Sequence, residues 1–244
     1  MKPTLFISDL HLDPGRPDIL RQFRRFTENF GTQAEAVYIL GDFVEYWIGD
    51  DDSAHGLDAV FTQLRELTTR TPVYLMHGNR DFLIGREFAA AYGMRLLQDP
   101  AIVELYGRRA LLMHGDTLCT DDIKYQAFRR MVRDENWQRD FLRKPLAERR
   151  QIVMGLRATS KQATQEKPEE IMDVNVDTVA TAMAQQGVDL LIHGHTHRPG
   201  VHSLQADGKK AQRIVLGDWY NRGNVLIYRP DGFELRDTDF SEPL

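Results

Sequence analysis

The chain has 244 residues, of which 42% are hydrophobic and 27% are charged, and its formal net charge is -5. This composition is ordinary for a soluble globular protein, and no apolar run reaches the roughly 18 residues that a membrane-spanning helix needs. The single cysteine excludes an internal disulfide, and the first residues lack the apolar core of a signal peptide, so we expect a cytoplasmic protein.

The first hundred residues alternate short apolar runs with segments of helical spacing. Apolar runs predict strands at residues 4–7, 36–40 and 73–76, and the 3–4-residue spacing predicts helices at 18–29, 57–67 and 86–92. Gly93 follows the last of these helices, where glycine favours a helix end. This alternation predicts a parallel sheet with helices packed on it.

The middle of the chain is rich in basic residues. Residues 102–106 and 110–113 flank Gly107 and resemble a hairpin, and a helical pattern follows. Residues 121–167 carry 12 Lys and Arg against 7 Asp and Glu. A basic segment in an otherwise acidic chain indicates either an anion-binding surface or a solvated helical face, and the charge alone does not distinguish the two. We expect one domain over residues 1–244, with residues 120–168 inserted as a helical cap.

The last seventy residues predict one helix followed by strands. Asn175 is placed to cap a helix that runs to Gln186 and ends at Gly187. A strand is expected at residues 189–192. Antiparallel strands are then expected at 201–204, 213–216, 225–228 and 233–236.

Five of the predicted strands are followed at once by Asp, Asn or His side chains. These residues are Asp9, His11, Asp42, Asn79, His114, His195 and His197. Because ligands bind beyond the carboxyl ends of strands in open α/β sheets, we expect these side chains at one edge of one sheet. Two carboxylates, one amide and four imidazoles suit two neighbouring first-row divalent metals such as Mn²⁺, Fe²⁺ or Zn²⁺ better than Mg²⁺ or Ca²⁺.

Together the five motifs resemble the calcineurin-like metallophosphoesterase superfamily. Longer strings, such as Trp47 to Asp52 and His114 to Asp122, resemble its branch that hydrolyses UDP-2,3-diacylglucosamine in lipid A biosynthesis. The resemblance implies a four-layer α/β/β/α sandwich with a helical cap insertion. It also implies two divalent metals, usually Mn²⁺. One would be held by Asp9, His11, Asp42 and His197, and the other by Asp42, Asn79, His114 and His195, with Asp42 bridging.

The implied reaction cleaves the diphosphate to UMP and 2,3-diacylglucosamine 1-phosphate. A hydroxide held by the two metals would attack the uridine-side phosphorus, and the catalytic residues would be Arg80, Asp42, Asn79 and His114. The resemblance places further residues around the substrate: Asn79, Arg80, Asp122, Tyr125, Arg157, Ser160, Thr164, Lys167 and His195. Arg80 stands where many relatives carry a histidine that acts with an aspartate as general acid. Arginine does not release a proton near neutral pH, so Arg80 fits a leaving group that departs as an anion.

The substrate carries acyl chains, which gives the apolar residues of the cap two interpretations. They either pack the cap onto the rest of the protein or line a groove for the chains. We also expect the basic residues of the cap to meet anionic phospholipid at the cytoplasmic face of the bacterial inner membrane: Arg139, Arg143, Lys144, Arg149 and Arg150.

Two other functions compete with this interpretation. A broad phosphodiesterase acting on cyclic nucleotides or nucleic acid would use the same metals, although Arg80 argues against it. A scaffold that has lost its metals would not retain all seven ligands. The overall acidity argues against nucleic acid as a partner, and no obligate protein partner is expected.

Overall fold

The computed structural model describes residues 1–53, 56–166 and 173–244, and for residues 159–166 it describes the helix without its side chains. Eleven strands form two sheets in the described part of the chain. The first sheet has the order β11 (Gly232–Thr238), β10 (Gly223–Arg229), β1 (Thr4–Ile7), β2 (Ala36–Leu40), β3 (Val73–Met76) and β4 (Met94–Leu97). The second has the order β5 (Ala101–Leu105), β6 (Arg108–Leu112), β7 (Leu190–His193), β9 (Lys209–Val215) and β8 (Gly200–Ala206).

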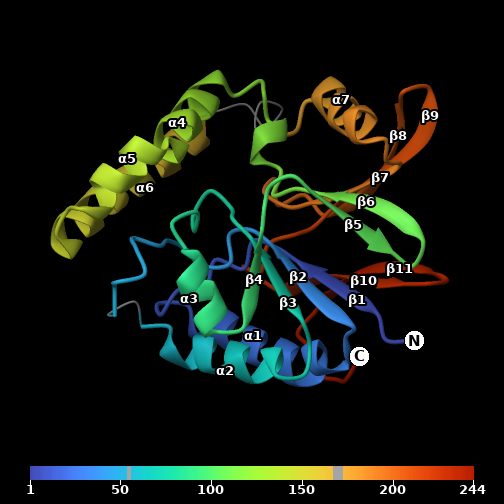
Figure 1. The fold of residues 1–244 in the computed structure, drawn as a ribbon, viewed down its shortest axis with the longest axis horizontal. Coiled ribbons are helices and arrows are strands. Elements are labelled where there is room, and N and C mark those ends of the chain that lie inside the picture. Colours follow the sequence, from blue (N-terminus) through green and yellow to red (C-terminus); the bar gives the residue numbers. More distant parts are fainter. Residues whose placement is uncertain (54–55, 167–172) are drawn as a thin grey trace.

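The strands alternate their side chains between different apolar layers. In β1, Leu5 and Ile7 join a core cluster under the helices α1 (Pro17–Asn29), α2 (Asp58–Thr68) and α3 (Arg86–Ala91). Phe6 points to the other side, into a cluster between the two sheets. A third cluster lies between the second sheet and α7 (Val176–Gln186). Three apolar layers separate four structural layers, which is the predicted α/β/β/α sandwich (Figure 1).

Three further helices lie beyond the ends of the strands, to one side of the sandwich (Figure 1). They are α4 (Ile123–Arg133), α5 (Glu135–Leu142) and α6 (Leu146–Glu166). Asp122 caps α4 by accepting from the backbone N–H of Tyr125, and Asp134 caps α5 in the same way. No helix in the described residues is both long enough and apolar enough to span a membrane.

Ion pairs attach α6 to the loop after β2. The guanidinium of Arg149 binds both oxygens of Asp51, at 2.6 and 2.8 Å, and donates to the carbonyl of Ile48. Arg150 binds Asp52 at 2.6 Å. Arg149 is only 5% exposed, so the prediction that it meets phospholipid is wrong.

The apolar residues of the cap divide between the two interpretations. Phe141 is buried in the core cluster beneath the first sheet, and Ile152 and Val153 pack against that cluster. Met131 and Leu142, in contrast, are exposed by 48% and 38%. Packing therefore explains the first group and leaves the second group unexplained.

The structure corrects two expectations about the strands and confirms a third. The motifs do not come from one sheet, because β6 and β7 belong to the second sheet. The C-terminal strands pair antiparallel as expected, β8 with β9 and β10 with β11, and the two hairpins lie in different sheets. Strand β4 was missed, since Met94–Leu97 contains a charged residue and follows directly on Gly93.

Candidate active site

The seven predicted ligands lie at the ends of five strands, and the ends of the two sheets face each other there. Asp9 and His11 follow β1, Asp42 follows β2 and Asn79 follows β3, so the first sheet supplies four side chains. His114 follows β6, and His195 and His197 follow β7, so the second sheet supplies three. The site therefore lies across the junction of the two layers.

One group of potential ligands contains Asp9, His11 and His197, whose ligand atoms all lie within 4.8 Å of one another. Nε2 of His11 lies 3.3 Å from Nε2 of His197, and Oδ1 of Asp9 lies 3.4 Å from the same His197 atom. Two imidazole nitrogens and a carboxylate oxygen that converge in this way can surround a cation.

The other group centres on Asp42, His114 and Asp9. Oδ1 of Asp42 lies 3.8 Å from Nε2 of His114, whereas Oδ2 of Asp42 lies 3.8 Å from Nε2 of His11. The two oxygens of Asp42 thus face different histidines. Oδ1 of Asn79 lies 3.1 Å from Nε2 of His114 and 3.0 Å from Nδ1 of His195, which adds two more ligands to this side.

Five of the seven residues adopt left-handed backbone conformations. The φ angles are 54° at Asp9, 49° at His11, 50° at Asp42, 68° at His195 and 55° at His197. Residues other than glycine seldom adopt positive φ, and such strain clusters at functional sites where the surrounding structure enforces it. The backbone therefore turns sharply after each strand and directs these side chains toward a common centre.

Outer oxygen atoms face the Nδ1 atoms of three of the imidazoles. Nδ1 of His114 lies 2.9 Å from the carbonyl of Leu40, so this nitrogen carries the proton and Nε2 faces the centre. Nδ1 of His11 lies 2.8 Å from Oε2 of Glu45, and Nδ1 of His197 lies 3.4 Å from Oδ2 of Asp218. Metal-binding histidines are oriented in this way by carboxylates and carbonyls. Glu45 and Asp218 were not predicted from the sequence.

The electrostatics fit divalent cations. Burial and the neighbouring carboxylates Asp81 and Asp9 raise the pKa of Asp42, although His114 and His11 oppose this. Burial alone would lower the pKa of His114, but the charges of Asp42, Asp116 and Asp9 raise it to about 9. Oδ1 of Asp9 is buried and accepts no hydrogen bond from any described residue. Cations would supply both the missing positive charge and a partner for this oxygen.

Two buried carboxylates hold the loops of the site. Asp81 accepts hydrogen bonds from the backbone N–H groups of Phe43 and Gly78, both at 2.7 Å, and so joins the loops after β2 and β3. Asp116 accepts from the Tyr125 hydroxyl at 2.8 Å and from Nε of Arg129 at 2.6 Å. It thereby connects α4 to the loop that carries His114.

Gly78 allows the two loops to approach closely. A Cβ atom at this position would lie 2.1 Å from Oδ1 of Asp42 and 2.2 Å from its backbone nitrogen. We expect Gly78→Ala to displace Asp42, to lower the melting temperature and to reduce the bound metal, which thermal denaturation and elemental analysis would measure. Gly155→Ala is the matched control, because its Cβ would meet nothing within 4 Å beyond the backbone of its own helix, and alanine in a helix stabilises by up to about 1 kcal/mol relative to glycine. Equal melting temperatures for the two variants would contradict the prediction.

Arg80 lies beside the cluster and presents positive charge to it. Its backbone N–H donates to Oδ1 of Asp42 at 2.8 Å, and its NH1 lies 4.0 Å from Oε1 of Glu45. Nε of Arg80 is buried and makes no hydrogen bond with any residue in the described part of the chain. The Arg80 side chain is 27% exposed, so its guanidinium can accept an additional anionic partner.

The predicted substrate residues outside the metal cluster are only partly described. Tyr125 lies close to His195, with ring centroids 5.7 Å apart, and Asp122 is largely engaged in capping α4. Arg157 reaches the site from α6, with NH2 2.5 Å from Oε1 of Glu45. The side chains of Ser160 and Thr164, and the whole of Lys167, lie outside the described residues.

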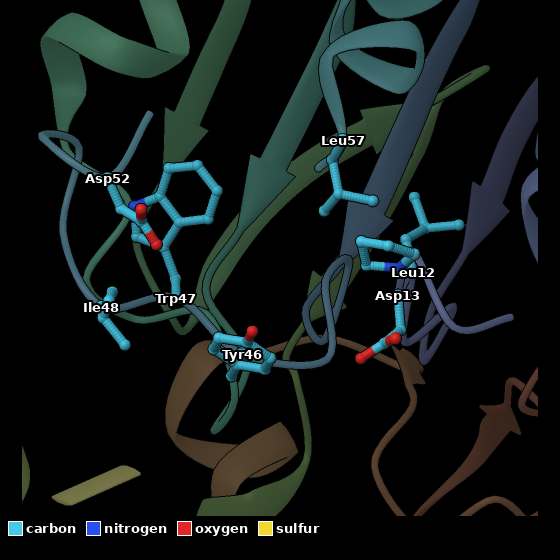
Figure 2. Close-up of a pocket in the computed structure, with 8 residues that line it drawn as sticks. Leu12, Asp13, Tyr46, Trp47, Ile48, Asp52 and Leu57 are labelled. Carbon is cyan, nitrogen blue, oxygen red and sulfur yellow. The ribbon is translucent and has the colours of Figure 1, made fainter. Parts of the chain in front are cut away.

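A small hollow lies beside the loop that carries His11. It is lined by Leu12, Asp13, Pro14, Tyr46, Trp47, Ile48, Asp52 and Leu57 (Figure 2). Its volume of about 10 Å³ has room for a single water molecule. This hollow is too small to hold a sugar, a nucleoside or an acyl chain.

Comparisons with known proteins agree with this geometry. A family model described as calcineurin-like phosphoesterase matches residues 2–199. The UDP-2,3-diacylglucosamine hydrolase of Stenotrophomonas maltophilia is 49% identical over 240 residues, which cover 95% of this chain and 97% of that protein. The Azotobacter vinelandii protein of the same name is 52% identical, with coverage of 95% and 97%. That of Vibrio atlanticus is 46% identical, with 98% of both chains covered.

Proposed function

Because the chain belongs to the calcineurin-like phosphoesterase family, we propose that it hydrolyses the diphosphate of UDP-2,3-diacylglucosamine in lipid A biosynthesis. The products would be UMP and 2,3-diacylglucosamine 1-phosphate. The observation that carries the proposal is the convergence of seven Asp, Asn and His side chains beside the partly exposed guanidinium of Arg80. Relatives named for this reaction match nearly the whole chain, including the helical segment 123–166.

Two divalent cations, which we propose to be Mn²⁺, would occupy the cluster. Asp9, His11, Asp42 and His197 would hold one, and Asp42, Asn79, His114 and His195 the other. Such a pair lowers the pKa of a water molecule and withdraws charge from phosphoryl oxygens. Glu45, Leu40 and Asp218 would keep the imidazoles in the orientation required, since each of them faces an outer ring nitrogen.

Arg80 would stabilise the charge that develops on the diphosphate. Its guanidinium keeps its proton throughout, so the residue contributes electrostatics and positioning rather than proton transfer. A sugar 1-phosphate is a weak base compared with an alkoxide and leaves as an anion. Attack of water on the uridine-side phosphorus then needs no general acid on the leaving side.

The helices α4, α5 and α6 would form a cap, residues 120–168, inserted within a single domain of residues 1–244. Arg157 and Tyr125 extend from this segment toward the metal cluster. With Asp122, Ser160, Thr164 and Lys167 they would surround the glucosamine and its phosphate. Exposed apolar side chains such as Met131 and Met154 would then be available to acyl chains or to lipid.

We also propose peripheral binding at the cytoplasmic face of the inner membrane. Arg143 lies at the C-terminal end of α5, is exposed, and pairs with the equally exposed Asp140. Charge reversal of Arg139 and Arg143 is expected to weaken binding to anionic vesicles more than tenfold, since each basic residue near such a surface contributes about 1 kcal/mol. Vesicle co-sedimentation at two salt concentrations measures this, and Arg24→Glu on α1 is the control. Binding that charge reversal leaves unchanged would exclude this surface.

The proposed reaction is tested by hydrolysis of UDP-2,3-diacylglucosamine in heavy-oxygen water, with and without added Mn²⁺. Heavy oxygen in UMP, lost on chelation, would support both the substrate and attack at the uridine-side phosphorus. Label in the sugar phosphate would retain the substrate but reverse the leaving group. Cleavage of a generic aryl phosphodiester without cleavage of the nucleotide sugar would favour a broad phosphodiesterase instead.

A further inference from the structure

Glu45 joins three parts of the site that no motif connects. Its Oε2 lies 2.8 Å from Nδ1 of His11, its Oε1 lies 2.5 Å from NH2 of Arg157, and NH1 of Arg80 lies 4.0 Å from the same Oε1. We propose that Glu45 is a positioning residue that holds the two phosphate-binding arginines together and fixes them relative to the metal ligand His11. This inference rests on the proposed function, because it takes Arg80 and Arg157 as the groups that receive the substrate's phosphates.

The backbone places Glu45 beside His11 by extending the pairing of β1 with β2. In these strands Thr4 lies opposite Ala36 and Ile7 opposite Ile39, and the isolated bridge of Leu12 with Val44 keeps the same offset. The N–H of Glu45 then donates to the carbonyl of Leu12 at 3.0 Å. The position of the carboxylate next to His11 therefore follows the register of β1 and β2, which backbone hydrogen bonds continue between the two loops.

The two arginines reach the same carboxylate from opposite parts of the protein. Arg80 comes from the loop after β3, and Arg157 comes from α6 and lies over the ring of Tyr46, 5.2 Å from its centroid. Two guanidinium groups repel each other, and a carboxylate that contacts both offsets most of this electrostatic repulsion. The negative charge of Glu45 thus keeps the two arginine side chains close together before the substrate binds.

Both arginines retain donors for a phosphate while they contact Glu45. Arg157 donates to Glu45 through NH2, and a guanidinium offers five N–H donors in a planar fork. The side chains of Arg80 and Arg157 are 27% and 28% exposed, so part of each guanidinium is open to a ligand. A diphosphate can therefore bind to the remaining donors of both arginines without displacing the carboxylate.

The neighbouring pair of Asp51 with Arg149 serves as a comparison. It also attaches α6 to the loop after β2, through two hydrogen bonds. Asp51, however, is itself 59% exposed and belongs to neither group of potential metal ligands in the described residues. A function limited to holding α6 in place predicts the same phenotype for Glu45→Gln and Asp51→Asn, whereas positioning of the arginines predicts different ones.

The test compares Glu45→Gln, Arg157→Met, the double variant and Asp51→Asn. We expect Glu45→Gln to raise KM for UDP-2,3-diacylglucosamine about tenfold, the effect of a lost charge-assisted contact, and to lower kcat less. Metal should be removed from this variant at a lower chelator concentration, because His11 loses its outer partner. Asp51→Asn should change neither the KM nor the chelator concentration that removes the metal. The KM of the double variant should rise by less than the product of the two single effects, because both single substitutions remove the contact between Glu45 and Arg157.

The outcomes separate this inference from the proposed function. If the unaltered protein does not hydrolyse UDP-2,3-diacylglucosamine, the proposed function fails. If it does, but Glu45→Gln matches Asp51→Asn in KM and in metal retention, the inference is overturned. Additive effects of Glu45→Gln and Arg157→Met on KM would overturn it as well. Calorimetry on the metal-stripped variants would measure their affinity for 2,3-diacylglucosamine 1-phosphate independently of turnover. The variants with the higher KM values should bind this product more weakly.

Discussion

Replacement of Asp42 by asparagine is expected to lower turnover of UDP-2,3-diacylglucosamine by about a thousandfold or more, because it affects both proposed metals at once. The two carboxylate oxygens of Asp42 face His11 and His114, one on each side of the cluster. Asparagine keeps the shape of the side chain but offers one oxygen and no charge. Steady-state turnover and elemental analysis of bound metal would measure the effect.

The same substitution has the opposite expected effect on the metal-free protein. Burial raises the pKa of Asp42, so its ionised form destabilises the folded state at pH values above its folded pKa. Asparagine removes this penalty, and the metal-free variant should melt at or above the temperature of the metal-free parent at pH 8. The difference should shrink as the pH falls, because the parent carboxylate then becomes protonated.

The exposed Asp177 provides the control substitution to Asn. A variant that melted well below its parent without metal would show that the loss of activity reflects misfolding.

Replacement of Arg80 by alanine is expected to reduce kcat for the nucleotide sugar by about a hundredfold, the typical effect of removing one preorganised group that stabilises transition-state charge. Hydrolysis of a generic aryl phosphodiester, which lacks the second phosphate, should fall much less. The backbone N–H of Arg80 still donates to Asp42 in this variant, so the metal cluster should remain intact. Parallel assays of the two substrates, with metal content as a control, measure the difference.

Two further substitutions refine the role of Arg80. Lysine retains the charge but not the planar fork, so Arg80→Lys should recover only part of the activity. Arg80→His should gain activity toward phosphate monoesters while losing it toward the diphosphate, because an imidazole can protonate an alkoxide. An Arg80→Ala protein with unchanged diphosphatase turnover would refute the proposed role.

Local sequence patterns predicted most of the helices and strands and all seven potential metal ligands. Apolar runs identified β1, β2 and β3, and Asn175 and Gly187 marked the two ends of α7 as expected. The seven ligand positions were recognisable because each follows a buried strand. What the sequence alone did not determine is which strands pair. The apolar runs of β6 and β7 are compatible with either sheet, because the sequence of a strand that is buried on both faces does not indicate which strand it pairs with.

Long-range contacts account for the other errors. Glu45 follows Asp42 by three residues and carries no motif, and its contact with His11 depends on the register of β1 and β2. Arg149 looks like any other basic residue of an amphipathic helix, yet Asp51 removes it from solvent. The positive φ angles at Asp9 and His197 could not be predicted from the sequence either, because neither residue type requires that conformation.

The position of β1 in its sheet has a consequence for synthesis of the chain. One edge of β1 pairs with β2, which leaves the ribosome soon after it, but the other edge pairs with β10, at Gly223–Arg229 near the end of the chain. A nascent chain therefore exposes an apolar, unpaired strand edge for most of its translation, and such edges promote aggregation. The strands of the second sheet and all seven ligand residues, the last of them His197, are synthesised before β10 can cover β1. The final stretch of translation thus closes the sheet on which the finished site depends.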